Sequence, residues 1–292
     1  MSAAALRREL KTLRERLGDL TAGAAIISDP VDWAEKVSGF TLDGWQKGVL
    51  RSKAKRLALL CSRQSGKSEA VSLLGAHIAA TGGAAVVVAP SLRQSSNLFR
   101  RMRAHLSRSG VRLTRETATD ITLAGGGWAT CLPGDRPSML RGLSLRHSGE
   151  AALLIDECAF VKNELWPVAS PMLAAAPEAR LVMLSTPAGP IGEFYRVWTD
   201  EASQFERITV AAADCPRISA DFLEEEKRRL GVLFAQEYLC QFITSGESVF
   251  SADALAAMFA KDTTPEAEQL EQTFDWAGLL PPSATTSKMW SD

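Results

Sequence analysis

The sequence predicts an α/β fold in which a mostly parallel central sheet carries helices on both faces. Two observations lead to this fold class. From residue 56 onward, short apolar runs alternate with stretches of helical pattern, and most of these runs are apolar throughout rather than at every second position. A strand with that pattern is buried on both faces, as are the strands of a parallel sheet covered by its crossover helices.

The N-terminal segment, residues 1–40, is predicted to be helical and to lie outside the sheet domain. Its leucines at positions 6, 10, 13, 17 and 20 alternate in steps of four and three, which is the pattern of an amphipathic helix over residues 5–20. Two heptads are too few for a coiled coil, so packing on the chain's own domain is favoured over binding a partner. The segment lacks the apolar core of a signal peptide, and the chain has no apolar run of about 18 residues that would predict a membrane span.

The remaining elements follow in order. Five apolar runs are predicted to be strands: 56–61, 84–90, 151–157, 179–187 and 205–210. Five stretches are predicted to be helices: 67–80, 92–107, 164–175, 191–199 and 218–242, the last broken at Gly231. A hairpin is predicted over 120–132, because the glycines at 125–127 tolerate the positive φ of a turn. These elements predict a domain over 41–250, closed by a small helical region, and a loosely ordered tail over 251–292.

The composition argues against several classes of site. The five cysteines are odd in number and never spaced as C-x-x-C, and the three histidines are never paired at ligand spacing. This pattern fits reduced thiols and gives little support for a disulfide framework, a zinc site or a Ser-His-Asp mechanism. The formal net charge is −1, so the chain as a whole gives no signal for nucleic acid.

One stretch is strongly basic. Between residues 93 and 115 there are seven arginines and no acidic residue: Arg93, Arg100, Arg101, Arg103, Arg108, Arg112 and Arg115. Together with the predicted hairpin turn, this arginine block is a candidate contact to a nucleic-acid backbone. A solvated helix face explains the same arginines equally well, and the sequence leaves both interpretations open.

The stretch LALLCSRQSGKSEA, residues 57–70, joins a predicted strand to a predicted helix through the pattern of a phosphate-binding loop. At such a loop the first helix amides point at the phosphates, Lys67 reaches the β- and γ-phosphates, and the Ser68 hydroxyl reaches Mg²⁺. The other candidate nucleotide-binding residues of the loop are Arg63, Gln64, Ser65 and Gly66. Cys61 stands where the usual pattern has its first glycine, so a helix start that happens to hold Gly-Lys-Ser is the alternative.

An acidic pair ends the predicted strand ALLIDE, residues 152–157. At a strand tip both side chains can reach a site above the sheet edge, where Asp156 would hold Mg²⁺ and Glu157 would activate water as a general base. Alone, such a pair commonly just ends a strand. About ninety residues after a phosphate loop, with a strand between, it indicates nucleotide hydrolysis. Ser185 and Thr186 end the next strand, where their hydroxyls could sense the γ-phosphate or simply terminate the strand.

Six segments, taken in order over residues 42–250, resemble the ATPase half of phage large terminases, the motors that package DNA into capsids. They are LDGWQKGVL, CSRQSGKS, LPGDRPSMLRGLS, LLIDECAFV, LSTPAGPIGEFYRVW and the helical region at 218–242. The second segment is similar to that family's variant phosphate loop, in which Ser or Cys replaces the first glycine. The resemblance therefore implies that the loop works with Cys61 in place, and it implies a phosphate-loop NTPase of the ASCE type.

The resemblance also implies roles and partners. Gln46 is a candidate adenine contact, Arg63 a loop arginine that reaches the γ-phosphate, and Arg141 a finger inserted into a neighbouring subunit. Thr186 would couple loss of the γ-phosphate to motion. The implied cofactors are ATP and Mg²⁺. The implied partners are double-stranded DNA, the portal protein, the small terminase subunit and further copies in a ring on the portal, with a monomer possible in isolation. The implied location is the host cytoplasm, with transient docking on the procapsid.

Two rival functions stay open. A helicase-type DNA translocase shares the ATPase class, although no second ATPase-like domain follows here. A non-catalytic assembly module would bind nucleotide as a structural switch without hydrolysing it. Full-length members of the family carry a nuclease domain after the ATPase domain, and the last forty or so residues are too short for one. We therefore expect no nuclease activity from this chain.

Overall fold

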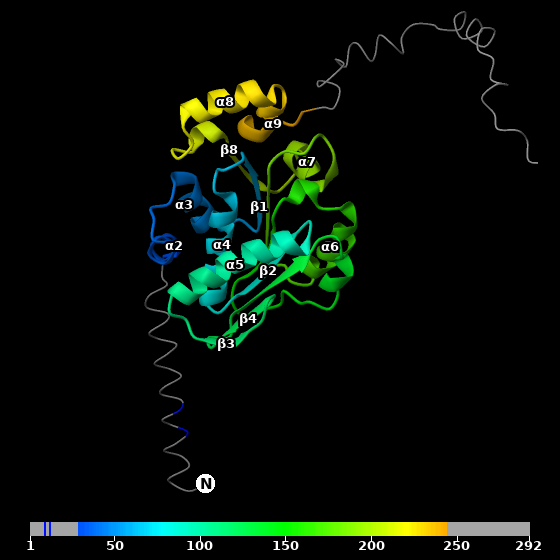
Figure 1. Ribbon diagram of the computed structural model, residues 1–292. Coiled ribbons are helices and arrows are strands. Elements are labelled where there is room, and N and C mark those ends of the chain that lie inside the picture. Colours follow the sequence, from blue (N-terminus) through cyan, green and yellow to red (C-terminus); the bar gives the residue numbers. More distant parts are fainter. Residues whose placement is uncertain (1–8, 10–11, 13–28, 244–292) are drawn as a thin grey trace, which may run out of the picture. The chain divides into compact units, whose positions relative to one another are not determined.

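A central sheet of eight strands runs through the part of the chain that the computed structural model describes, which comprises residues 9, 12 and 29–243 (Figure 1). The strands are β1 (Arg56–Cys61), β2 (Ala84–Ala89), β3 (Leu113–Glu116), β4 (Asp120–Leu123), β5 (Trp128–Pro133), β6 (Ala151–Ile155), β7 (Arg180–Ser185) and β8 (Glu206–Val210). Their order in the sheet is β3-β4-β5-β2-β6-β7-β1-β8.

The sheet is parallel except at one edge. β5, β2, β6, β7, β1 and β8 pair in parallel, and β4 and β3 continue the sheet antiparallel from β5. This confirms the predicted fold class, all five predicted strands and the hairpin, which is formed by β4 and β5. The sequence missed β3, because most of its side chains are exposed and it has no apolar run. The sequence also gave no individual bounds for the two helices α2 (Pro30–Ser38) and α3 (Gly44–Arg51).

The burial of β1 explains why its sequence is apolar throughout. Leu57, Leu59 and Cys61 belong to the hydrophobic core on one face of the sheet, and Ala58 and Leu60 belong to the core on the other face. Successive side chains of a strand point to opposite faces, so a strand covered on both sides needs apolar residues at every position. None of these five residues is more than 2% exposed.

Helices cover both faces. The first core contains residues of α2 (Pro30–Ser38), α3 (Gly44–Arg51), α4 (Lys67–Ala80) and α5 (Leu92–Arg108). The second core contains residues of α6 (Trp166–Ala174) and α7 (Gly192–Thr199). α6 begins directly after a short 3₁₀ turn (Asn163–Leu165), which accounts for the predicted helix start near residue 164. The other short 3₁₀ turns are Pro137–Leu140, Cys158–Phe160 and Ala212–Asp214.

The two helices next to the phosphate loop are packed closely. A side chain at Gly75 of α4 would put its Cβ 2.7 Å from Met102 of α5 and 2.8 Å from Leu154 of β6. Only glycine lets the helix lie that near to both neighbours. α5 is amphipathic and turns its buried residues, among them Phe99 and Leu106, toward α4 and the sheet. Its arginines are therefore left on the outer side.

A small helical region stands at the carboxyl end of β1 and β8 (Figure 1). It consists of α8 (Ala220–Leu230) and α9 (Leu233–Leu239), which are held by a minor core around Phe234 and Tyr238. The predicted break at Gly231 is confirmed, and this glycine has a positive φ of 55°. The predicted helix at 5–20 and the predicted tail at 251–292 lie outside the described residues, apart from residues 9 and 12. No described helix combines the length and the apolar character that a membrane crossing requires.

Candidate functional site

The loop between β1 and α4 has the backbone of an anion-binding turn. Gln64 and Gly66 have positive φ angles of 60° and 92°, and α4 begins at Lys67 without a side-chain cap on its first amides. Uncapped amides at the start of a helix are donors for an anionic ligand. Ser65 is fully buried and its hydroxyl donates to the carbonyl of Ser62 at 2.9 Å, which fixes the loop from inside.

Cys61 ends β1 and is fully buried. Burial raises the pKa of its thiol well above the usual range, so the side chain stays neutral at any pH near 7. A neutral buried thiol behaves as a small apolar group. The residue that stands in place of the usual first glycine is therefore a core residue at the base of the loop and adds no charge to it.

The phosphate loop and the start of α4 are in contact with the acidic pair. The ammonium nitrogen of Lys67 lies 3.0 Å from Oε1 of Glu157, and the Ser68 hydroxyl donates to Oδ2 of Asp156 at 3.4 Å. Glu157 adopts a left-handed φ of 48°, and its N–H donates to Oδ1 of Asp156 at 2.9 Å. Left-handed backbone is strained for a residue with a long side chain, and such strain is concentrated at functional sites. Both carboxylates of the strand tip thus contact residues at the start of α4.

Asp156 is the more buried of the two acids, with 6% of the residue exposed. Burial first, and the neighbouring charge of Glu157 second, raise the pKa of Asp156 to about 6. A buried carboxylate beside a serine hydroxyl offers the oxygen ligands that Mg²⁺ prefers. Mg²⁺ commonly takes only one or two protein oxygens and fills its shell with phosphates and water.

Ser185 and Thr186 lie at the tip of β7, the strand between the loop strand β1 and the acidic strand β6. Ser185 is paired with Leu60 of β1, and its hydroxyl accepts a hydrogen bond from the N–H of Ala159 at 3.2 Å. Thr186 is 4% exposed. These two residues therefore lie between the two halves of the site, as the predicted parallel sheet requires.

Arg63, the arginine of the phosphate loop, is held by a residue of α9. Arg63 forms an ion pair with Glu237 of α9, and its backbone N–H donates to the Glu237 carbonyl at 2.8 Å. This ion pair is the main cause that raises the pKa of Arg63. Arg141 lies on an exposed loop after the 3₁₀ turn at Pro137–Leu140, and its side chain has no hydrogen bond or ion pair within the described part of the chain. Arg63 nevertheless lies near enough to the acidic pair that the charge of Glu157, after that of Glu237, helps to raise its pKa.

In the folded chain, acidic residues from neighbouring elements neutralise part of the arginine block. Arg101 pairs with Glu69 of α4 at 2.9 Å, and Arg103 pairs with Glu116 of β3 at 3.2 Å. The sequence showed no acid within the block, but the fold supplies these two from neighbouring elements. The hairpin turn lies at the amino end of β5, whereas the phosphate loop follows the carboxyl end of β1. The two features therefore lie at opposite ends of the parallel strands. A Cβ on Gly127 would lie 1.9 Å from the carbonyl of Ala79, so this glycine is needed for packing against α4.

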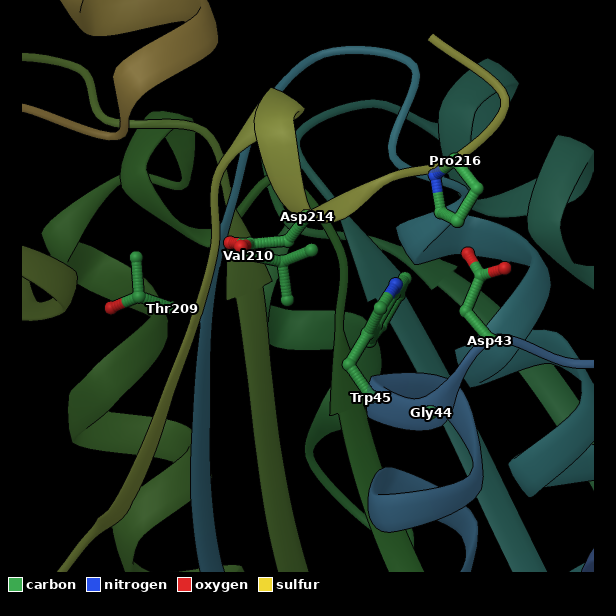
Figure 2. Close-up of a pocket in the computed structure, with 7 residues that line it drawn as sticks. All are labelled: Asp43, Gly44, Trp45, Thr209, Val210, Asp214 and Pro216. Atoms are coloured by element: carbon green, nitrogen blue, oxygen red, sulfur yellow. The ribbon is translucent and has the colours of Figure 1, made fainter.

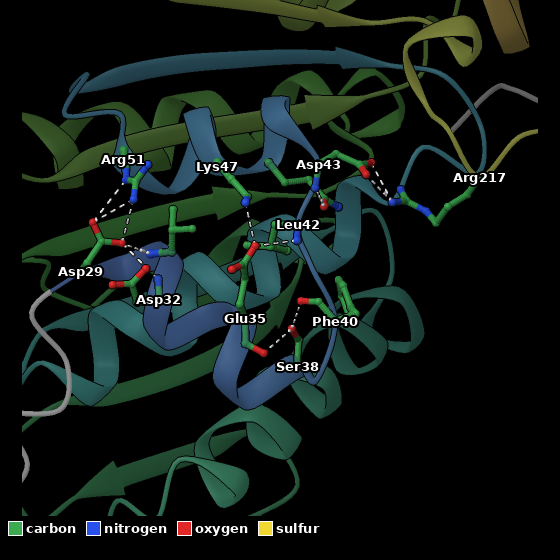
Figure 3. A network of polar contacts seen from close by, with 12 residues as sticks. Asp29, Asp32, Glu35, Ser38, Phe40, Leu42, Asp43, Lys47, Arg51 and Arg217 are labelled. Atoms are coloured by element: carbon green, nitrogen blue, oxygen red, sulfur yellow. Dashed lines mark hydrogen bonds and ion pairs between the residues drawn. The ribbon is translucent and has the colours of Figure 1, made fainter.

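Arg217 is the residue that the sequence missed. Its guanidinium donates to Oδ1 of Asp43 at 2.8 Å (Figure 3). It also donates to the Ser65 carbonyl of the phosphate loop at 2.8 Å, and so joins the start of α3 to the loop. The side chain of Gln46 lies close by: its Oε1 accepts the N–H of Asp43 at 2.9 Å, and its Nε2 would be 3.0 Å from a Cβ on Gly66. Arg217 and Asp43 are 174 residues apart, which is why no local pattern connects them.

A cavity of about 390 Å³ opens beside this bridge (Figure 2). The residues that line it come from the start of α3, the end of β8 and the segment after it: Asp43, Gly44, Trp45, Thr209, Val210, Asp214 and Pro216. Gln46 is not among them and is only 1% exposed, because its carboxamide is turned under the loop.

These features define a class of protein. A lysine-bearing loop after one strand, an acidic pair after another, and one strand between them are the arrangement of phosphate-loop NTPases of the ASCE type. A family model described as terminase large subunit, T4likevirus-type, N-terminal, matches residues 58–257, and the chain belongs to this family.

Solved structures show the same fold. The large terminase ATPase domain of Thermus phage P74-26 is 21% identical with a TM-score of 0.60, and the match covers 72% of this chain and 97% of that one. The large terminase from another thermophilic bacteriophage, in complex with ADP, is 17% identical with a TM-score of 0.57, and the match covers 69% of this chain and 54% of that one. A structure of that second terminase with ATP-gamma-S has also been solved, at 16% identity and a TM-score of 0.55. No curated protein sequence matches the chain significantly.

Proposed function

We propose that this chain hydrolyses ATP and couples that reaction to moving double-stranded viral DNA into a procapsid. The observation that carries the proposal is the contact between the two halves of the site, in which the ammonium of Lys67 lies 3.0 Å from the carboxylate of Glu157. A phosphate-binding cation and a candidate general base at this distance can act on the two sides of one scissile bond. Membership of the terminase family supports the packaging role.

The residues of the site have distinct tasks in this reaction. Lys67 binds the β- and γ-phosphates, which draws it away from Glu157 and leaves that carboxylate to accept a proton from the attacking water. Ser68 and Asp156 hold Mg²⁺, which supplies charge neutralisation at the phosphates when it is bound. The amides of Gln64, Ser65 and Gly66 surround the phosphates.

The finer assignments remain part of the proposal. Arg63 reaches the γ-phosphate after leaving Glu237, and Arg141, which is exposed, acts on the site of a neighbouring subunit in a ring. Thr186 couples loss of the γ-phosphate to motion, and Gln46 supports the nucleotide from beneath the loop. The arginines of α5 for which the described residues provide no ion pair, Arg93, Arg100 and Arg108, contact DNA. The portal protein and the small terminase subunit are the proposed protein partners, in the host cytoplasm and on the procapsid.

The variant Glu157→Gln tests the proposal. Removal of the general base is expected to lower the rate of ATP hydrolysis by about 10²–10⁴-fold while ATP still binds. The rate is measured by phosphate release with DNA present, and binding by calorimetry. Glu164→Gln is the matched control, because Glu164 is an exposed acid a few residues further along the same connection and has no role in the site.

Two outcomes would contradict the proposal. If Glu157→Gln hydrolysed ATP at the wild-type rate, the general base would be wrongly assigned. If the unaltered chain bound ATP but did not hydrolyse it with DNA and further copies present, the assembly-module alternative would replace the enzyme. Separation of DNA strands during hydrolysis would favour the helicase alternative over a packaging motor.

A further inference from the structure

Glu69 joins the first turn of α4 to α5, the helix that lies beside it (Figure 1). It directly follows Lys67 and Ser68 in the chain. Its Oε2 accepts a hydrogen bond from Nη1 of Arg101 at 2.9 Å, and its Oε1 lies 3.0 Å from Nε2 of His105. His105 first, against the opposing effect of burial, and then Arg101 lower the pKa of Glu69. Glu69 is therefore a carboxylate at neutral pH, with the same sign of charge as a nucleotide phosphate.

The two partners of Glu69 differ in their access to solvent. The side chain of His105 is 4% exposed, and neither ring nitrogen has a hydrogen-bond partner in the described part of the chain. The side chain of Arg101 is 56% exposed. An ion pair with so exposed a partner contributes little stability, because water and salt compete for both groups. An anion from solution can therefore take Arg101 away from Glu69, whereas His105 stays buried.

Arg101 belongs to a row of arginines on the outer side of α5. Arg93, Arg100, Arg101 and Arg108 are all exposed, and at 100° per residue they lie within an arc of about 100°. The row extends for about 22 Å along the helix. Within the described residues the other three arginines have no ion pair. Such a row matches a phosphodiester backbone, which has charges at short intervals, better than it matches a single small anion.

We propose that Arg101 is the residue through which bound duplex DNA acts on the phosphate loop. The inference rests on the proposed function and gives a task to Arg101 and Glu69, which that function leaves unused. When a DNA phosphate binds Arg101, Glu69 loses its neutralising partner in the first turn of α4. The carboxylate then repels the phosphates of a nucleotide at the same helix end. DNA therefore weakens nucleotide binding and favours the release of ADP, and by linkage ADP weakens DNA binding by the same factor.

The test measures the affinity for ADP by calorimetry at one fixed ionic strength, without DNA and with a saturating short DNA duplex. In the unaltered chain we expect DNA to weaken ADP about threefold or more. Two variants should remove this dependence and shift the affinity in opposite directions.

Glu69→Gln removes the charge and keeps the shape of the side chain. It should bind ADP at least as tightly as the DNA-free unaltered chain, whether or not DNA is bound. Arg101→Ala leaves Glu69 without Arg101 in both states. It should therefore bind ADP about threefold more weakly than the unaltered chain, with no further loss when DNA is added. The melting temperature of each variant checks that it is folded.

Arg103→Ala is the matched control. Arg103 lies on the same helix and forms an ion pair of the same kind, at 3.2 Å, with Glu116. Glu116 belongs to the edge strand β3 and not to α4. This variant loses one arginine and one exposed ion pair, as Arg101→Ala does, but DNA should still weaken ADP about threefold.

The outcomes separate this inference from the function on which it rests. If DNA weakened ADP as much in Glu69→Gln as in the unaltered chain, or if Arg103→Ala lost the dependence as Arg101→Ala did, the inference would be overturned. Equal ADP affinity with and without bound DNA in the unaltered chain would also overturn it, and would leave the proposed function intact. Failure of the unaltered chain to bind ADP or DNA at all would overturn both.

Discussion

The candidate nucleotide site has two sides that are built in different ways. The phosphate side, Lys67, Ser68, Asp156 and Glu157, stands on the ends of two buried strands and the helix after one of them. The cavity side, Asp43, Trp45, Pro216 and Arg217, is assembled from the start of α3 and the segment after β8. On the first side the geometry of the sheet fixes the functional atoms, and on the second a half-exposed arginine fixes them. Backbone pairing therefore positions the phosphate side, and side-chain contacts position the cavity side.

The largest effect expected from this contrast is in the variant Lys67→Ala. Loss of charge-assisted hydrogen bonds to phosphate should weaken ATP and ADP by about 10- to 100-fold, equivalent to about 1.5–3 kcal/mol. Adenosine, which has no phosphate, should bind the variant as it binds the unaltered chain. Calorimetry with all three ligands provides the measurement.

Lys162→Ala is the matched control for that experiment, because Lys162 is an exposed lysine near the same strand tip. Its affinities should remain at the wild-type values. Should adenosine weaken as much as ATP in Lys67→Ala, the two sides would not be independent and the contrast would fail.

The sequence was informative about the phosphate side for a physical reason. Lys67 and Ser68 are adjacent to the strand that positions them, and Asp156 and Glu157 are adjacent to theirs, so local patterns contain the information. Parallel pairing then brings both strand ends to one edge of the sheet. The contacts of Lys67 with Glu157 and of Ser68 with Asp156 follow from these two facts.

The cavity side could not be predicted in this way. The bridge of Arg217 joins residues 174 positions apart, and Pro-Arg after a strand has no pattern that marks it as functional. The same limit applies to the arginine block, whose partners Glu69 and Glu116 come from other elements. β3 was missed because an exposed edge strand has little apolar pattern. Sequence patterns show what is buried or local, and they do not show polar contacts between distant segments.

A smaller effect is expected where the two sides touch, at Gly66. Its φ of 92° is in the left-handed region, and a Cβ there would lie 3.0 Å from Nε2 of Gln46 and 3.1 Å from Nη2 of Arg217. Gly66→Ala should cost about 1–2 kcal/mol for the backbone alone. For a domain of this size that is a loss of roughly 2–8 °C in melting temperature, measured by calorimetry.

Gly48→Ala provides the opposite control. Gly48 lies inside α3 with no atom within 4 Å of its Cβ position and no positive φ, so alanine should stabilise the helix by about 0.5–1 kcal/mol. Equal melting temperatures for Gly66→Ala and the unaltered chain would mean that the loop adapts to a side chain, and that the two sides are less rigidly joined than the contacts indicate.

The smallest effect concerns pH and the anchoring of α2 and α3, the second of which contributes Gly44 and Trp45 to the cavity side (Figure 3). A hydrogen bond from the Asp32 N–H, aided by Arg51, lowers the pKa of Asp29 below 3.8, and a hydrogen bond from Lys47 lowers that of Glu35 below 4.5. A lowered pKa gives stability that is fully present above the unfolded-state value and is lost as pH falls through the folded-state value. Amide exchange corrected for pH should therefore rise in α2 and α3 as pH falls below the range in which free carboxyls titrate, about 4. In Lys47→Ala this acid-dependent rise should be smaller, since the Glu35 contact is already absent; an unchanged rise would mean that the Glu35 carboxylate does not anchor these helices.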